Sequence, residues 1–105
     1  MELVETAAFT ERIMRLLNEE EYLRLHANLV ARPKQGDVIP GTVGLRKLRW
    51  GAGARGKRGG IRVIYYCYDS IDRILLMYAY DKATQGDLTK HHLRLLSNYV
   101  KDGVL

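Results

Sequence analysis

The chain has little of several residue types, and each shortage excludes a class of protein. Cys67 is the only cysteine, so no internal disulfide can form. No stretch approaches the roughly 20 apolar residues that a membrane-spanning helix needs. Glu2, Glu5 and Glu11 stand where a secretory signal would be basic and then apolar. We therefore expect a cytoplasmic protein without a membrane segment.

Length and apolar content favour one folded domain. A chain of 105 residues is long enough for one compact domain and too short for two ordinary ones. Its apolar content is 47%, and glycine and proline are not in excess, which argues against a disordered chain. We expect residues 1–105 to form a single domain, with Cys67 in its core.

Acidic residues are absent between Val38 and Tyr68, and positive charge gathers there. This segment carries a charge of +7, whereas the rest of the chain sums to −2. Such a concentration is typical of a surface that contacts phosphates, although a basic loop exposed to solvent would have the same composition. The seven cations are Arg46, Lys47, Arg49, Arg55, Lys57, Arg58 and Arg62.

Hydrophobic patterning predicts that the chain begins with a short strand and two helices. Residues 3–5 fit a strand, and the apolar spacing over 7–17 is helical. Asn18 followed by Glu21 matches a capping box, which opens a second helix that Pro33 ends. The two helices should form a hairpin.

Three strands should follow a loop over residues 34–44. In the first, 45–50, alternation places Lys47 and Arg49 on one face and two apolar residues on the other. The segments 61–68 and 73–82 are rich in β-branched and aromatic residues and should form an antiparallel hairpin.

The pairing register of this hairpin decides what lies beside Arg62, which shares its strand face with apolar and aromatic residues. A loop at 70–72 sets Arg62 opposite Tyr80 and leaves Lys82 nearby on the same face. A loop one residue shorter would oppose Arg62 to Ala79 instead.

A last helix should start between Thr84 and Asp87 and run to about Lys101. We expect His91 and His92 to be exposed, since adjacent helix residues point about 100° apart and cannot share one metal. His26 has no ligand partner at metal-binding spacing. We therefore expect neither a metal nor a cofactor. The predicted core stripe of this helix is Leu88, Leu95, Leu96 and Tyr99.

The basic segment suits cleavage of RNA by its own 2′-hydroxyl. That reaction needs removal of the hydroxyl proton, stabilisation of charge on phosphorus and protonation of the departing oxygen. Arg62 is best placed to clamp the phosphate in a forked geometry. Lys47, Lys57 or Lys82 would transfer protons only if neighbouring cations ease the loss of the ammonium proton. Tyr66 and Tyr80 would stack a base or orient the sugar, or else pack in the core.

The order of these parts resembles the RelE superfamily of bacterial toxins. The resemblance covers nearly the whole chain and is most specific over residues 36–82. The segments GTVGLRKLR (41–49) and GKRGG (56–60) look most like the HigB branch, with GIRVIYY (60–66) and YDK (80–82) behind them.

This resemblance implies a small curved antiparallel sheet, an N-terminal helical hairpin, a C-terminal helix and helices on one side. It implies the toxin of a type II toxin-antitoxin system, an endoribonuclease that cuts translated mRNA in the ribosomal A site. An antitoxin would cover the basic surface and bind operator DNA together with the toxin.

Carried over position by position, the phosphate clamp falls on Arg62 and the strand cations on Lys47 and Arg49. Lys82 takes the basic position after the last strand, with Ala83 where RelE has a second cation. RelE's catalytic tyrosine has no match here, so Tyr80, Lys57, His91 and His92 remain open for proton transfer. We expect catalysis from Arg62, Lys57, Lys82 and Tyr80, and RNA binding by Arg46, Lys47, Arg49, Arg55 and Arg58.

Two other functions fit the same sequence. A ParE-like toxin of this fold inhibits DNA gyrase without catalysis, and would not need converging cations. A plain nucleic-acid-binding module would lose affinity modestly at each substituted cation.

Overall fold

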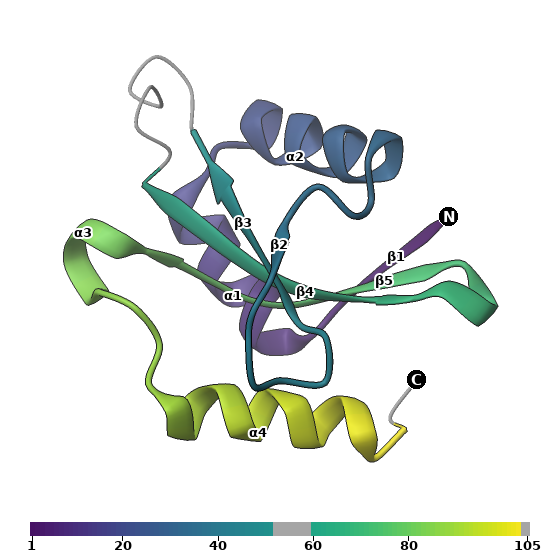
Figure 1. The fold of residues 1–105 in the computed structure, drawn as a ribbon. Helices are drawn as coiled ribbons and strands as arrows, with labels where there is room; N and C mark the ends of the chain where they lie inside the picture. Colours follow the sequence, from purple (N-terminus) through teal and green to yellow (C-terminus); the bar gives the residue numbers. More distant parts are fainter. Residues whose placement is uncertain (52–59, 104–105) are drawn as a thin grey trace.

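The computed structural model describes residues 1–51 and 60–103, which form an α+β fold around one five-stranded sheet (Figure 1). Its strands lie in the order β1-β5-β4-β3-β2. The expected antiparallel sheet is wrong at one edge, because β1 pairs with β5 in parallel and only the remaining pairs are antiparallel. Two helices separate β1 from the other strands, so no tight turn imposes the antiparallel direction. The strands are β1 (Glu2–Glu5), β2 (Asp37–Val38), β3 (Arg46–Trp50), β4 (Ile61–Tyr68) and β5 (Arg73–Asp81).

Two helices follow β1, as the patterning predicts. Helix α1 (Ala7–Leu16) starts at Thr6, whose hydroxyl oxygen accepts from the Phe9 amide. Helix α2 (Glu19–Ala31) starts at the predicted capping box, in which Asn18 and Glu21 each accept from the other's backbone amide. Both starts are therefore specified locally.

The sheet is covered on both faces, so the expectation of helices on one side is wrong. Helices α1 and α2 cover one face, and α4 (Lys90–Lys101) lies across the other (Figure 1). The reason lies in β4 and β5, whose residues are apolar on both faces and need cover on each. The first core includes Phe9, Ile13, Leu25, Val63 and Tyr65, and the second includes Leu45, Ile64, Leu75, Tyr80 and Val100.

The central hairpin sets Arg62 opposite Tyr80, which confirms the predicted pair. The loop itself differs, because Tyr68 pairs with Arg73 and residues 69–72 form the turn. A bulge at Ile64/Tyr65 adds one residue to β5 and restores the predicted register beyond it. Two deviations from the simple hairpin therefore cancel at Arg62.

The last predicted helix starts later than expected, and a separate short helix precedes it. Helix α3 (Lys82–Gln85) ends at Gly86, whose φ of 79° favours glycine, and α4 begins after Thr89 caps it. The predicted start of this helix is therefore wrong. The predicted burial of Leu95 and Tyr99 is also wrong, since their exposed fractions are 53% and 38%. Leu88 lies before the start of α4. Its helical spacing to Leu95, seven residues later, therefore does not identify the buried face of the helix. That face carries Leu93, Leu96, Ser97 and Val100.

The predicted loop over residues 34–44 contains one pairing that the sequence did not reveal. Asp37 and Val38 form the short edge strand β2 against β3, and the chain beyond them runs beside α4 (Figure 1). Over residues 1–51 and 60–103, no helix has the length and apolarity to cross a membrane.

Candidate active site

Three polar side chains from different elements converge on Asp87, in the segment between α3 and α4. The Tyr80 hydroxyl donates to Asp87 Oδ1 at 3.4 Å. Lys47 Nζ, from β3, lies 3.9 Å from Oδ1, and Lys82 Nζ, from the start of α3, lies 3.7 Å from Oδ2. We name Lys47, Tyr80, Lys82 and Asp87 the Asp87 cluster. It joins one carboxylate, two ammonium groups and one phenol.

Short-range features of the chain build this cluster. Asp81 ends β5 and caps α3, since its carboxylate accepts from the Ala83 amide at 2.9 Å. Gly86 then turns the chain after α3, so that Asp87 comes back toward Lys82 and Tyr80. The segment after β5 therefore places a carboxylate over the end of the sheet.

Arg62 lies beside the cluster on the same sheet face. It pairs across the strands with Tyr80 on one side and Arg49 on the other. The side chain of Arg62 is only 6% exposed, and its Nη1 donates to the Ile61 carbonyl at 3.4 Å. Residues directly opposite each other on neighbouring strands share a face. A row of Arg49, Arg62 and Tyr80 thus crosses β3, β4 and β5.

Tyr80 is held as a neutral proton donor. Its burial, followed by the negative charge of Asp87, raises the pKa of the hydroxyl above its ordinary value, while the Arg62 charge acts the other way. At neutral pH the phenol therefore keeps its proton and donates a hydrogen bond to Asp87. Tyr80 is 1% exposed, so its ring packs in the core. Of the two interpretations of the sequence, core packing therefore holds for Tyr80 and base stacking does not.

The structure places Arg46 on the opposite face of β3 from Lys47 and Arg49. Its Nη1 donates to the backbone carbonyls of Lys34 at 3.1 Å and Gly36 at 2.7 Å. It pairs with Tyr65, which belongs to the first core, whereas Lys47 pairs with Ile64 of the second. Successive strand residues point to opposite faces, so Arg46 must leave the face that carries Lys47. The structure therefore does not bring Arg46 to the Asp87 cluster. Arg46 instead holds the backbone around β2, and its predicted RNA-binding role stays a prediction.

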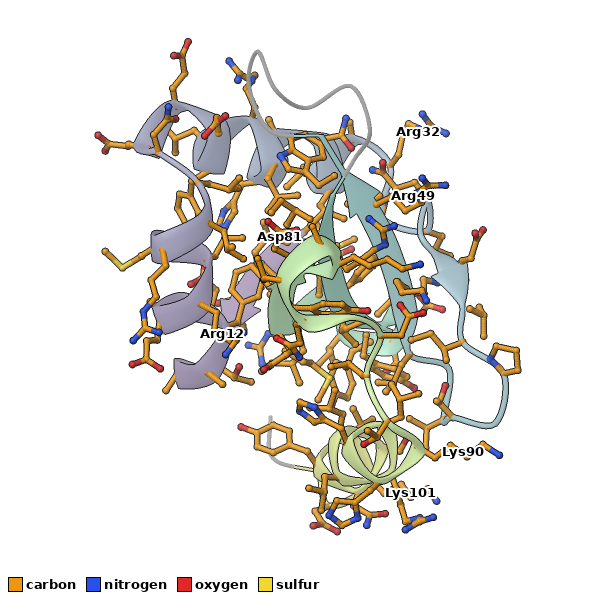
Figure 2. The ribbon with its side chains drawn as sticks, turned by 90° about the vertical axis from the view of Figure 1, so that its left-hand side faces the viewer. Arg12, Arg32, Arg49, Asp81, Lys90 and Lys101 are labelled. Atoms are coloured by element: carbon orange, nitrogen blue, oxygen red, sulfur yellow. The ribbon has the colours of Figure 1, made fainter. Side chains whose placement is uncertain are left out.

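The remaining predicted RNA-binding residues divide into two groups. Arg49 is exposed, and Figure 2 shows it on the same side of the molecule as Lys90, whereas Arg12 lies on the other side. Arg55, Lys57 and Arg58 fall outside the described residues, so the catalytic role predicted for Lys57 and the binding roles of Arg55 and Arg58 stay predictions. Of the predicted site, the structure therefore joins Lys47, Arg49, Arg62, Tyr80 and Lys82.

Asp87 is the residue of this candidate site that the sequence did not indicate. Aspartate is a common N-cap, so the sequence predicts only a possible helix start at Asp87. A signal was present, since Asp87 is the only acidic residue between Asp81 and Asp102 in a segment rich in lysine, arginine and histidine. A lone carboxylate among several cations is expected to attract them, and the structure places two lysines beside it.

The histidines lie in two different surroundings. His91 is exposed, as predicted, but His92 is half-buried with its ring 4.6 Å from that of Tyr78. Burial, and then the charge of Arg12, lower the pKa of His92. His26 does have a carboxylate partner, Glu5, brought from β1 at 3.0 Å. Within 1–51 and 60–103, no three His, Cys, Asp or Glu side chains gather as metal ligands would.

These groups can bind a phosphodiester and move protons around it. Arg62, Arg49 and the two lysines supply positive charge, Asp87 can accept a proton, and Tyr80 and the lysines can donate one. Comparison with models of known protein families finds none that matches this chain.

Proposed function

We propose that this protein is the toxin of a type II toxin-antitoxin system and a ribosome-dependent endoribonuclease that cuts mRNA by attack of the 2′-hydroxyl. One observation carries the proposal: Arg62 and the Asp87 cluster place a guanidinium, two ammonium groups, a carboxylate and a phenol on one sheet face. RNA cleavage needs a proton acceptor, a proton donor and positive charge at the phosphate, and these groups can supply all three. The RelE-like order of parts in the sequence supports the same function.

Each group has a role that its position allows. Arg49, which is exposed, contacts a non-bridging phosphate oxygen, and the charge of the nearly buried Arg62 beside it stabilises the negative charge that builds on phosphorus. Asp87 takes the proton of the 2′-hydroxyl as the bond from O2′ to phosphorus forms. The bond from phosphorus to O5′ then breaks, and Lys82 gives O5′ a proton. The products are a 2′,3′-cyclic phosphate and a 5′-hydroxyl.

Tyr80 and Lys47 position the proton acceptor. Tyr80 donates to the same Asp87 oxygen that Lys47 approaches, so side chains from β5 and β3 both hold that carboxylate. Substrate would displace the lysines from Asp87, since their distances of 3.9 and 3.7 Å leave both only loosely paired. Lys57, Arg55 and Arg58 would add charge from the connector between β3 and β4.

The solvent exposure of the site fits an enzyme that depends on a larger partner to position its substrate. The side chains of Asp87 and Lys82 are about half exposed, so water is not excluded around them. Such a site gains most when the RNA is already held in line for attack, because positioning alone supplies a large part of a rate enhancement. The ribosome would supply that alignment. The resemblance adds an antitoxin that covers the basic face and carries the toxin to operator DNA.

Primer extension on translated messages tests this proposal. Cells expressing the protein without its antitoxin should show cuts in register with codons, and Arg62→Ala should abolish them. Arg24→Ala is the control, since Arg24 is an exposed arginine on α2 that pairs with Glu20, and it should leave the cuts unchanged. Intact messages together with stalled gyrase on DNA would reject the nuclease and favour a ParE-like inhibitor.

A further inference from the structure

A second basic surface lies apart from the Asp87 cluster, between α4 and the loop that joins β2 to β3. It is a groove of about 630 Å³, a size common for ligand sites. Residues 40–43 form one wall, and α4 forms the other. The proposed cleavage chemistry does not use any of these residues.

The charge of this groove has one sign. Lys90, Arg94 and Lys101 are the cations of α4, and all of them line the groove. Neither α4 nor the rest of the lining contains an acidic residue. Helix α2, by contrast, has three glutamates in its first turn. Charges placed only for solubility would mix signs, so this arrangement indicates an anionic ligand.

The wall opposite α4 has a fixed shape. The Thr42 hydroxyl donates to the Ile39 carbonyl at 2.7 Å and accepts from the Leu45 amide at 3.1 Å. Gly41, with a φ of 77°, makes the turn there. On the α4 side, Ser97 is 6% exposed, and its Oγ has no hydrogen-bond partner among the described residues. An ordered wall facing a row of cations and an unpartnered hydroxyl is a surface prepared for a ligand.

One end of the groove is close to the candidate active site along the chain, because Lys90 lines the groove and follows Asp87 by three residues. Figure 2 shows Lys90 on α4 and Arg49 farther up on the same side of the molecule. At a rise of 1.5 Å per residue, the stretch from Lys90 to Lys101 extends roughly 16 Å along α4. That length accommodates several phosphates of one strand rather than a single small anion.

We propose that this groove binds the backbone of the same RNA strand, several nucleotides to one side of the phosphate that is cut. The inference rests on the proposed function for its choice of RNA. The uniformly positive lining, the length of the groove along α4 and its start three residues after Asp87 favour a strand that also reaches the cleavage site over a short acidic protein segment.

Binding of uncleavable RNA tests the groove independently of catalysis. The probes are oligouridylates with 2′-O-methyl riboses, about 4 and about 16 nucleotides long, a range that spans typical single-strand sites. The groove variant is Lys90→Gln/Arg94→Gln/Lys101→Gln. The control variant, Arg15→Gln/Arg24→Gln/Lys34→Gln, removes the same charge from α1, from α2 and from the exposed Lys34, which pairs with Asp69 at the turn between β4 and β5.

The groove variant should bind the long probe more weakly and lower its salt slope by about 2 units, since each phosphate contact contributes about 0.7. The short probe should bind the groove variant as it binds the wild type, and the control should match the wild type for both. Arg94→Gln alone should lower the long-probe slope by less than one unit, which keeps the test valid if the triple variant unfolds.

Three results would overturn the inference: equal losses in the two triple variants, no salt-dependent binding of RNA by the wild type, or competition by polyglutamate as strong as by RNA. Failure of the proposed function has a different signature. In that case the wild type would bind the long probe through α4 but would not cut translated mRNA.

Discussion

Replacing Asp87 with asparagine tests the assignment of the proton acceptor. Asparagine keeps the size of the side chain and an oxygen that can accept from Tyr80, but it cannot take a proton from a 2′-hydroxyl. Its lost ion pairs are long, at 3.9 and 3.7 Å, and Asp87 is 54% exposed. Such pairs contribute at most about 1 kcal/mol, so the variant should stay folded.

Cleavage and binding should change in opposite directions in this variant. Loss of a general base lowers the rate of the chemical step by about 100-fold or more. Loss of a negative charge between Lys47 and Lys82 frees both ammonium groups for phosphates, so RNA should bind more tightly and with a steeper salt dependence. A merely structural carboxylate would not separate the two effects.

The assay is single-turnover cleavage of a message on purified ribosomes, with affinity for uncleavable RNA measured in parallel. Asp69→Asn is the matched control, since Asp69 is an exposed aspartate paired with Lys34 at 2.9 Å in the turn before β5. It should change neither quantity. An Asp87→Asn protein that cuts at the wild-type rate would refute the assignment of Asp87 as the base.

Three further predictions follow from other contacts. Tyr80→Phe removes the donor to Asp87 while keeping the buried ring, so single-turnover cleavage should fall by about tenfold, with affinity for RNA unchanged. Gly36→Ala would bring a Cβ within 2.9 Å of the Tyr65 ring and 3.1 Å of the Lys47 backbone, and chemical denaturation should show a loss of about 1–3 kcal/mol. Burial, and then its hydrogen bond to Glu5, raise the pKa of Tyr22 to about 12, so folding favours the protonated phenol. The stability from this group is complete below the unfolded pKa of about 10 and is lost as the pH rises toward 12, so Tyr22→Phe should flatten the decline in unfolding free energy over that interval.

Local signals in the sequence were enough to predict most of the elements. The Asn18 capping box and the alternation of β3 and β4 act within a few residues, and the structure has both. The position of Arg62 opposite Tyr80 was also correct, but for a reason the sequence did not show. The turn is one residue longer than assumed, and the bulge compensates for it.

Features that depend on distant contacts were harder to predict. The direction of β1 depends on the path that the chain takes through α1 and α2 before it returns to the sheet. The hydrophobic pattern of a short edge strand is the same for parallel and antiparallel pairing. The break at Gly86 moved the start of the last helix and brought Asp87 to the lysines, so one missed turn hid both the helix boundary and the carboxylate. Arg46 could have been separated from Lys47 by alternation alone, but the total charge of the segment concealed it.

The most direct test of the central claim is the chemistry of the cut itself. A message with a single 2′-deoxynucleotide at the cleaved position should remain intact on ribosomes with the wild-type protein, while the all-ribose message is cut to a 2′,3′-cyclic phosphate and a 5′-hydroxyl. Cleavage of the deoxy-substituted message at the same position, or no cleavage of either message, would contradict the account.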